Sequence, residues 1–213
     1  MWSDVRDYAK AHPAIVPFIN QDPHLAASIS PNSNKERWLV GDGKAYINTG
    51  IVPTGKTRFE VRYKNDSNAY SSCGSRTAYL VDGFTIHSGV DTQFNNGTQN
   101  LQTGFNTGNT MHLLIFDAPN KKAYIDDRSW DISQCYGNKY PLWLFANNNA
   151  GAPHNQGAAT YEFARIYEDT DQVANFLPCL YNGIAGMVDA ISGTFHPNAN
   201  TQGQFTIAIT DKE

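Results

Sequence analysis

The sequence is poor in charged residues. They make up only 17% of its 213 residues, against roughly 25% in an average soluble domain. Leu, Lys and Glu are scarce as well, while Asn, Thr, Gly and Tyr are frequent, and this composition favours β-sheet over helix. The 16 Lys and Arg residues against 20 Asp and Glu residues give a net charge of −4, without a basic block. We therefore expect no nucleic acid partner, because binding to a phosphate backbone needs clustered cations.

Long hydrophobic runs and cysteine motifs are also missing. No segment approaches the roughly 18 consecutive apolar residues that cross a bilayer, so we expect no membrane insertion. Charged residues interrupt the first ten positions, where a secretory signal would carry an apolar run. Cys73, Cys135 and Cys179 show no CxxC or Cys/His spacing. We interpret them as small buried hydrophobic residues of a protein made in a reducing compartment, unless the chain is a fragment of a longer exported protein.

Residues 1–34 differ from the rest of the chain. Val5, Tyr8 and His12 fall on one face of a short helix that Pro13 would end, and an apolar, proline-containing run follows at 14–19. A helix of this length is marginal alone. We expect residues 1–34 to form a helical attachment segment with a linker near 28–34, packed either on its own domain or on a partner subunit such as another virion or surface protein.

From residue 35 onward, short runs alternate between apolar and polar residues. The run 57–63 has the period of a half-buried antiparallel strand, and 111–116 with 122–125 predicts a hairpin. The run 140–146 is apolar on both faces, which is typical of a strand deep in a double layer. Further candidate strands are 45–48, 78–81, 84–87, 101–105, 161–167 and 205–209. This pattern predicts one all-β domain over 35–213, a sandwich of two antiparallel sheets.

Four phrases in a fixed order carry a resemblance to a known family. They are WLVGDGKAYINTG at 38–50, KAYIDD at 122–127, PLWLFANN at 141–148, and the stretch 165–195 that contains RIY, FLPC and GMVDAISGTF. Together they resemble the laminin-G-like domains of the concanavalin A-like jelly rolls, which are common in bacteriophage tail and virion proteins and in surface proteins of gut bacteria. The resemblance implies a jelly-roll β-sandwich, and it supplies no functional motif. Residues 1–34, the short helical segment before the sandwich, lie outside the resemblance.

Carboxylates in the spacing of a glycosidase are absent from the sequence. A retaining enzyme needs two carboxyl groups roughly 5 to 5.5 Å apart, and β-glucanases on this kind of sandwich place them as E-x-D-x-x-E on one strand. The nearest acidic groups here lie at 126–131 and 162–169, and neither has carboxylates at i and i+2, as one strand face requires. We therefore predict that the protein is not an enzyme.

Calcium is the one ion for which the sequence offers donors. Asp82, Asp91, Asp126 and Asp127 are oxygen ligands on or beside turns, and laminin-G-like domains often hold one Ca²⁺ in this way. No spaced series such as D-x-D-x-D is present. We predict no cofactor, with a bound Ca²⁺ as the alternative.

Carbohydrate binding needs an aromatic ring for the apolar face of a sugar, with amides and charged groups for its hydroxyls. The chain has both kinds of residue near turns, and its loop at 147–156 is rich in amides. Arg76 is interpreted either as an exposed ligand anchor or as the partner of a carboxylate. The candidate ligand-binding residues are Asn147, Asn148, Asn149, His154, Arg76, Tyr70 and Trp130.

These inferences point to a non-enzymatic recognition or structural module of a phage particle, displayed on a tail, fibre or head, that binds host-surface glycan. A virion protein is assembled in the host cytoplasm and acts outside it, which reconciles an extracellular type of fold with the lack of an export signal. Two alternatives stay open. One is a carbohydrate-binding module of a longer protein on a bacterial cell surface, and the other is an architectural virion protein without a glycan site.

Overall fold

The computed structural model describes residues 5–22, 25, 35–66 and 71–211 of the chain. The described part starts with short helices, α1 (Val5–Ala11), the 3-10 turn η1 (Pro13–Ile15) and α2 (Val16–Gln21). The strands that follow are β1 (Lys35–Asp42), β2 (Ile47–Asn48), β3 (Thr57–Asn65), β4 (Ser71–Ala78), β5 (Val81–Ser88), β6 (Gln93–Asn95), β7 (Asn100–Gln102), β8 (His112–Asp117), β9 (Lys122–Ile125), β10 (Arg128–Asp131), β11 (Trp143–Leu144), β12 (Asn147–Asn149), β13 (Ala152–His154), β14 (Ala158–Glu168), β15 (Asp171–Tyr181), β16 (Ile184–Asp189), β17 (Thr194–Pro197) and β18 (Phe205–Asp211).

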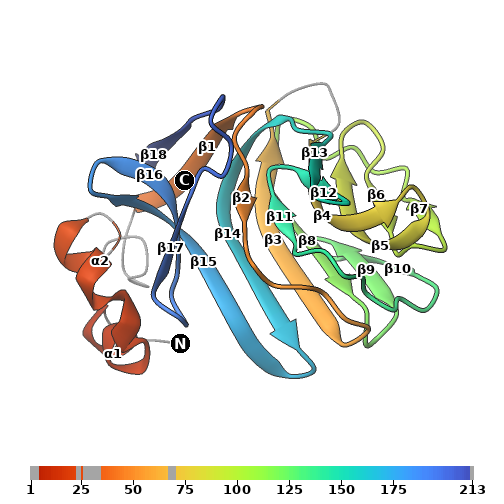
Figure 1. The fold of residues 1–213 in the computed structure, drawn as a ribbon, viewed down its shortest axis with the longest axis horizontal. Coiled ribbons are helices and arrows are strands. Elements are labelled where there is room, and N and C mark those ends of the chain that lie inside the picture. The colour runs from red at the N-terminus through yellow and green to blue at the C-terminus, as the bar shows by residue number, and fades with distance from the viewer. Residues whose placement is uncertain (1–4, 23–24, 26–34, 67–70, 212–213) are drawn as a thin grey trace.

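The strands form two sheets (Figure 1). The larger has the order β10-β9-β8-β3-β14-β15-β16-β17, and β1 joins it beside the first half of β14, with β18 outside β1. The smaller has the order β13-β12-β4-β5-β6-β7, and β11 links β4 to β2. Neighbouring strands are antiparallel except for β12 and β4, which run parallel. This arrangement confirms the predicted all-β sandwich of two sheets.

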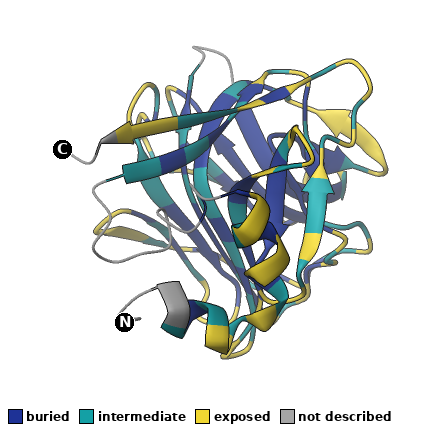
Figure 2. Ribbon diagram, turned by 90° about the vertical axis from the view of Figure 1, so that its left-hand side faces the viewer, coloured by how far each residue is buried: buried dark blue, intermediate teal, exposed yellow. Residues whose placement is uncertain are grey.

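The core lies between the sheets because apolar side chains alternate along the strands. Phe59, Val61 and Tyr63 of β3 face inward, as their spacing predicts, and the small sheet contributes residues such as Phe84. The ring of Phe84 stacks on that of Phe116 from the large sheet, with the centroids 4.2 Å apart. Figure 2 shows the buried residues along the central strands and the exposed ones on loops and helix surfaces.

Several local predictions are confirmed and two are wrong. The run 57–63 lies in β3, and the hairpin is formed by β8 and β9. The run 140–146 is not one strand: only Trp143 and Leu144 pair, because the backbone of Phe145 enters the left-handed region at φ +66° and redirects the chain into β12. The run 78–81 is a turn between β4 and β5, in which Leu80 has φ +56°.

The N-terminal helices pack on the sandwich, beside β15 to β17 at the left of Figure 1. They enclose a second apolar cluster with the large sheet, in which the ring of Phe18 lies 4.8 Å from that of Tyr181. The members of this cluster are Tyr8, Ile15, Phe18, Leu25, Cys179, Val188 and Ala190. Of the two expected arrangements, the structure shows packing on the chain's own domain. Attachment of residues 1–34 to another subunit stays a prediction, and the linker expected at 28–34 lies outside the described residues.

Candidate functional site

The clearest hollow of the small sheet lies over β4, β5 and β6, next to β13. It has a volume of about 410 Å³. Because side chains alternate between the two faces of a strand, Cys73 of β4 packs in the core while Arg76 lies on the outer face. We call this site the Arg76 hollow, and its lining residues are Arg76, Tyr79, His87, Gln93, His154 and Asn155.

Arg76 forms the floor of the hollow. Its side chain is largely covered, with the residue only 5% exposed. Nε donates to Oδ1 of Asn149 at 3.1 Å, and Nη2 donates to Nδ1 of His154 at 3.2 Å. Strand β12 pairs with β4 along one edge and with β13 along the other. This pairing brings together residues that are far apart in the sequence.

His87 lies opposite Ser72 on β4 and opposite Gln93 on β6. Its Nδ1 is 2.6 Å from the hydroxyl of Ser72 and 3.5 Å from the amide nitrogen of Asn155. Burial lowers the pKa of His87 to about 3, and the neighbouring Arg76 and His154 add to the effect. Burial and the charge of Arg76 also lower the pKa of His154. Both imidazoles are therefore neutral at pH 7.

Tyr79 stands at the rim of the hollow. It lies in the turn between β4 and β5 and is 62% exposed. The centroid of its ring is 5.9 Å from Cζ of Arg76, which is within cation–π range. An exposed aromatic ring beside a buried cation and planar amides is the combination that a sugar ring requires.

The structure assigns different places to the predicted site residues. Arg76 and His154 line the hollow, and Asn149 holds Arg76. The interpretation of Arg76 as the partner of a carboxylate is wrong, because within the described residues no carboxylate oxygen lies within 4.0 Å of it. Arg76 is buried rather than exposed, and its role as a ligand anchor stays a prediction. Tyr70 lies outside the described residues.

The other predicted residues have structural positions. Asn147 is completely buried and accepts a hydrogen bond from Thr85. Asn148 is 2% exposed and holds its own loop, because Nδ2 donates to the Pro141 carbonyl while Oδ1 accepts from Gly151. Trp130 lies on β10, paired with β9 and half-buried against the core. Asn147 and Asn148 are thus buried within the fold, and Trp130 is not in the hollow.

Four lining residues were not in the predicted set: Tyr79, His87, Gln93 and Asn155. Asn155 lies in the loop at 147–156, whose amide-rich composition is the sequence signal that indicates it. Tyr79 was assigned to a strand instead of a turn. His87 and Gln93 become neighbours only through the β5–β6 register, for which the sequence carries no separate signal.

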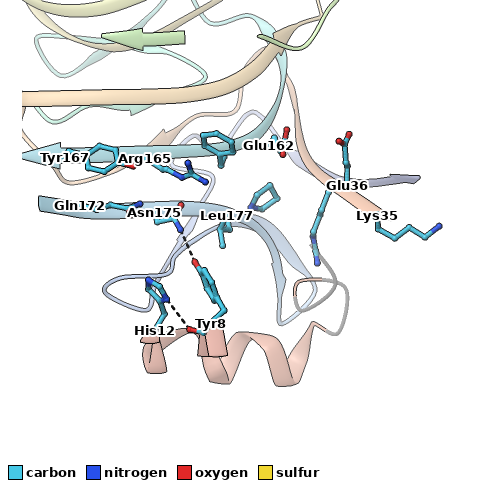
Figure 3. A pocket seen from close by; sticks show the side chains of 13 residues that line it. Tyr8, His12, Lys35, Glu36, Glu162, Arg165, Tyr167, Gln172, Asn175 and Leu177 are labelled. Atoms are coloured by element: carbon cyan, nitrogen blue, oxygen red, sulfur yellow. Dashed lines mark hydrogen bonds between the residues drawn. The ribbon is translucent and has the colours of Figure 1, made fainter. Parts of the chain in front are cut away.

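A second cavity, the α1 groove, lies between helix α1 and the outer face of the large sheet (Figure 3). Its volume is also about 410 Å³. The hydroxyl of Tyr8 accepts a hydrogen bond from Asn175 at 2.9 Å, which ties α1 to β15. Among the charged residues that line the groove, Arg37 pairs with Asp22, Glu162 pairs with Arg62 at 2.5 Å, and Arg165 lies 3.8 Å from Glu60. The arginines of this groove therefore have carboxylate partners, unlike Arg76.

Of the four acidic residues considered for calcium, Asp91 and Asp126 accept local hydrogen bonds. Asp126 contacts Nδ1 of His112 at 2.6 Å and accepts from the backbone of Leu113, and Asp91 accepts from Gly104. In the part of the chain that the structure describes, no three His, Cys, Asp or Glu side chains are grouped to hold a metal ion. Nor does any helix there have the length and apolarity of a membrane span.

No family model matches the chain, and no curated protein matches its sequence. A solved structure from Bacteroides ovatus, described as a candidate carbohydrate-binding protein, superimposes with a TM-score of 0.58 at 10% identity. The match covers 84% of this chain and 61% of that one, so the chain spans about three fifths of the Bacteroides protein. The chain is a jelly-roll β-sandwich.

Two further matches are weaker. A mutant of the NanB sialidase from Streptococcus pneumoniae matches with a TM-score of 0.46 at 10% identity, over 84% of this chain and 39% of that one. A β-glucanase from Bacillus licheniformis matches with a TM-score of 0.32 at 17% identity, over 64% of this chain and 94% of that one.

Proposed function

We propose that the protein binds carbohydrate in the Arg76 hollow without cleaving it. The observation that carries the proposal is the position of Tyr79, whose exposed ring stands beside the buried guanidinium of Arg76. The ring provides an apolar plate for one face of a pyranose, while the polar groups below it bind hydroxyls. A volume of about 410 Å³ is within the range of small-ligand sites. The fold likeness to a candidate carbohydrate-binding protein supports the same function.

Binding rather than hydrolysis is proposed because of the side chains in the hollow. A glycosidase of the common type uses two carboxyl groups on either side of the scissile bond. The residues lining the hollow are an arginine, a tyrosine, two histidines and two amides, so none of them supplies a carboxyl group. The histidines are neutral and lie in contact with Arg76 or Ser72. Such groups hold a sugar in place and leave its glycosidic bond intact.

We propose further that this binding serves recognition at a surface. The family resemblance favours a phage particle that contacts host glycan, and a module of a bacterial surface protein is the alternative. The two settings share the same chemistry in the hollow, so the binding experiment applies to both.

The test is binding of the full chain to an array of bacterial and plant polysaccharides, with Tyr79→Ala as the variant. Truncation of a stacking aromatic is expected to weaken binding about tenfold or more. Tyr136→Ala is the matched control, because Tyr136 is 75% exposed and is not part of the hollow. Equal binding by both variants would place the glycan elsewhere. No binding by the wild-type chain to any polysaccharide would favour the architectural alternative.

A further inference from the structure

Arg76 is an unusual arginine in this protein. Arg37, Arg58 and Arg62 each lie within 4.0 Å of a carboxylate oxygen. Arg76 is about as buried as Arg37, since the residue is only 5% exposed. Its hydrogen-bond partners, however, are the amide oxygen of Asn149 and Nδ1 of His154. Among the described residues it has no counter-ion. A buried charge without a partner is destabilising, and a bound anion would offset this cost.

The neighbours of Arg76 add hydrogen-bond donors and no compensating charge. A guanidinium only donates, so Nδ1 of His154 is an acceptor, and a neutral imidazole then carries its proton on Nε2. Nδ1 of His87 likewise accepts from the amide nitrogen of Asn155, which leaves Nε2–H as its donor. Oε1 of Gln93 accepts from Asn100 at 2.9 Å, so its amide N–H groups remain for a ligand.

Arg76 thus has no counter-ion among the described residues, and hydrogen-bond donors surround it. We infer that the ligand of the Arg76 hollow is an acidic glycan, in which a sugar carries a singly charged oxyanion such as a carboxylate or a sulfate ester. The inference rests on the proposed glycan binding and names its ligand class. The planar fork of an arginine matches the geometry of an oxyanion, and the bond is charge-assisted. The ring of Tyr79, 5.9 Å from Cζ, covers the sugar that bears the anion.

The charge balance of the chain makes this site distinct. The protein carries a net charge of −4, so its overall field repels an anionic polymer. An acidic glycan would bind only where a local cation is left unpaired. In the α1 groove, which has the same volume, the lining arginines Arg37 and Arg165 already lie within 4.0 Å of the carboxylates of Asp22 and Glu60. Of the two hollows, the Arg76 hollow is therefore the one where an anion gains more.

The experiment uses pairs of polysaccharides that differ only in charge. Polygalacturonate, alginate and hyaluronan are compared with their carboxyl-reduced forms, chondroitin sulfate with its desulfated form, and neutral glucan and mannan are included. We expect binding to at least one acidic polymer, a loss of about tenfold or more on removal of its carboxylate or sulfate, and weaker binding at high salt. The carboxylate and sulfate pairs distinguish the two sources of the anion.

The variants test whether Arg76 is responsible. Arg76→Gln is expected to lose binding to the acidic polymer by about tenfold or more, while Arg76→Lys retains part of it because the charge stays. Arg128→Gln is the matched control, since Arg128 is exposed on β10 and stacks on Phe105 outside the hollow. If Arg76→Gln does not fold, the salt dependence and the charge-paired polymers still test the inference with the wild-type chain.

Three results would overturn the inference in distinguishable ways. Binding to neutral polymers that Tyr79→Ala removes and Arg76→Gln leaves unchanged would refute the acidic ligand and keep the proposed function. Binding to an acidic polymer that both Arg76→Gln and Arg128→Gln weaken equally would mean diffuse attraction instead of a site. Absence of binding to every polymer would refute both the proposed function and the ligand class.

Discussion

Asp22 and Arg37 form a buried ion pair that joins the N-terminal helices to the large sheet. Nη1 of Arg37 donates to Oδ1 of Asp22 at 2.7 Å, and a second bond joins Nη2 to Oδ2. Oδ2 also accepts from the backbone N–H of Leu180 at 2.7 Å. Burial alone would raise the pKa of Asp22, but the bonds from Arg37 and Leu180 lower it overall. The N-terminal segment is therefore held on the sandwich by a buried ion pair as well as by apolar packing.

Asp22→Asn is expected to lower the free energy of unfolding by about 3 to 5 kcal/mol, because it leaves the Arg37 guanidinium buried without a counter-charge. Urea unfolding measures the effect. Asp169→Asn is the control, since Asp169 pairs with Lys56 at the exposed surface and such pairs contribute little. Equal losses in the two variants would contradict a structural role for the buried pair.

The stability of the protein is expected to depend on pH through His87. Its pKa of about 3 in the folded state lies below the ordinary 6.5, so the unfolded chain binds the proton more readily. Stability is therefore complete above about pH 6.5 and declines as the pH falls toward 3. Arg76 and His154, the charged and titratable groups beside it, oppose its protonation.

His87→Gln is expected to flatten this decline, because the variant has no imidazole to protonate. The measurement is the urea midpoint of both proteins between neutral pH and pH 4. Curves that run parallel over this range would mean that another group is responsible for the acid sensitivity.

Gly74 is a position where we expect even alanine to be strongly destabilising. It has φ +126°, and a Cβ built there would lie 2.1 Å from the carbonyl oxygen of Phe84 in the paired strand. Gly74→Ala must displace backbone and is expected to cost more than about 3 kcal/mol. Gly151→Ala is the control, since Gly151 also has positive φ, at +92°, but open space around it. Thermal unfolding of both variants separates the clash from the backbone strain, and similar melting temperatures would contradict the clash.

All three cysteines are expected to be unreactive in the native protein. Burial raises the pKa of Cys73 and Cys179 to about 12 and that of Cys135 to about 11. The thiolate is the reactive form, so each thiol is both uncharged and covered. A disulfide reagent in mildly alkaline buffer is expected to label no cysteine in the folded chain and all three in denaturant. Rapid labelling of the native protein would show that one of these sites opens.

The alternation of apolar residues was enough to predict β3, whose Phe59, Val61 and Tyr63 lie in the core. The β8–β9 hairpin was predictable because only a short loop separates its two strands. The same reasoning failed at 140–146, where both faces are apolar and no period exists to show that the chain turns at Phe145. Amide-rich composition pointed to the loop after residue 146. It did not distinguish Asn147 and Asn148, whose side chains form hydrogen bonds within the fold, from Asn149, whose side-chain oxygen accepts a hydrogen bond from Arg76.

By itself, the sequence determined the fold class, the role of the cysteines as small buried hydrophobic residues and the short helical start, because each depends on composition or on a pattern along a few residues. Only the tertiary structure decided what Arg76 does. Its contact with His154 joins residues 78 positions apart, and it exists because β12 pairs in parallel with β4. Whether a charge is compensated depends on every group that folding brings within a few ångströms of it, and no local pattern of residues records that.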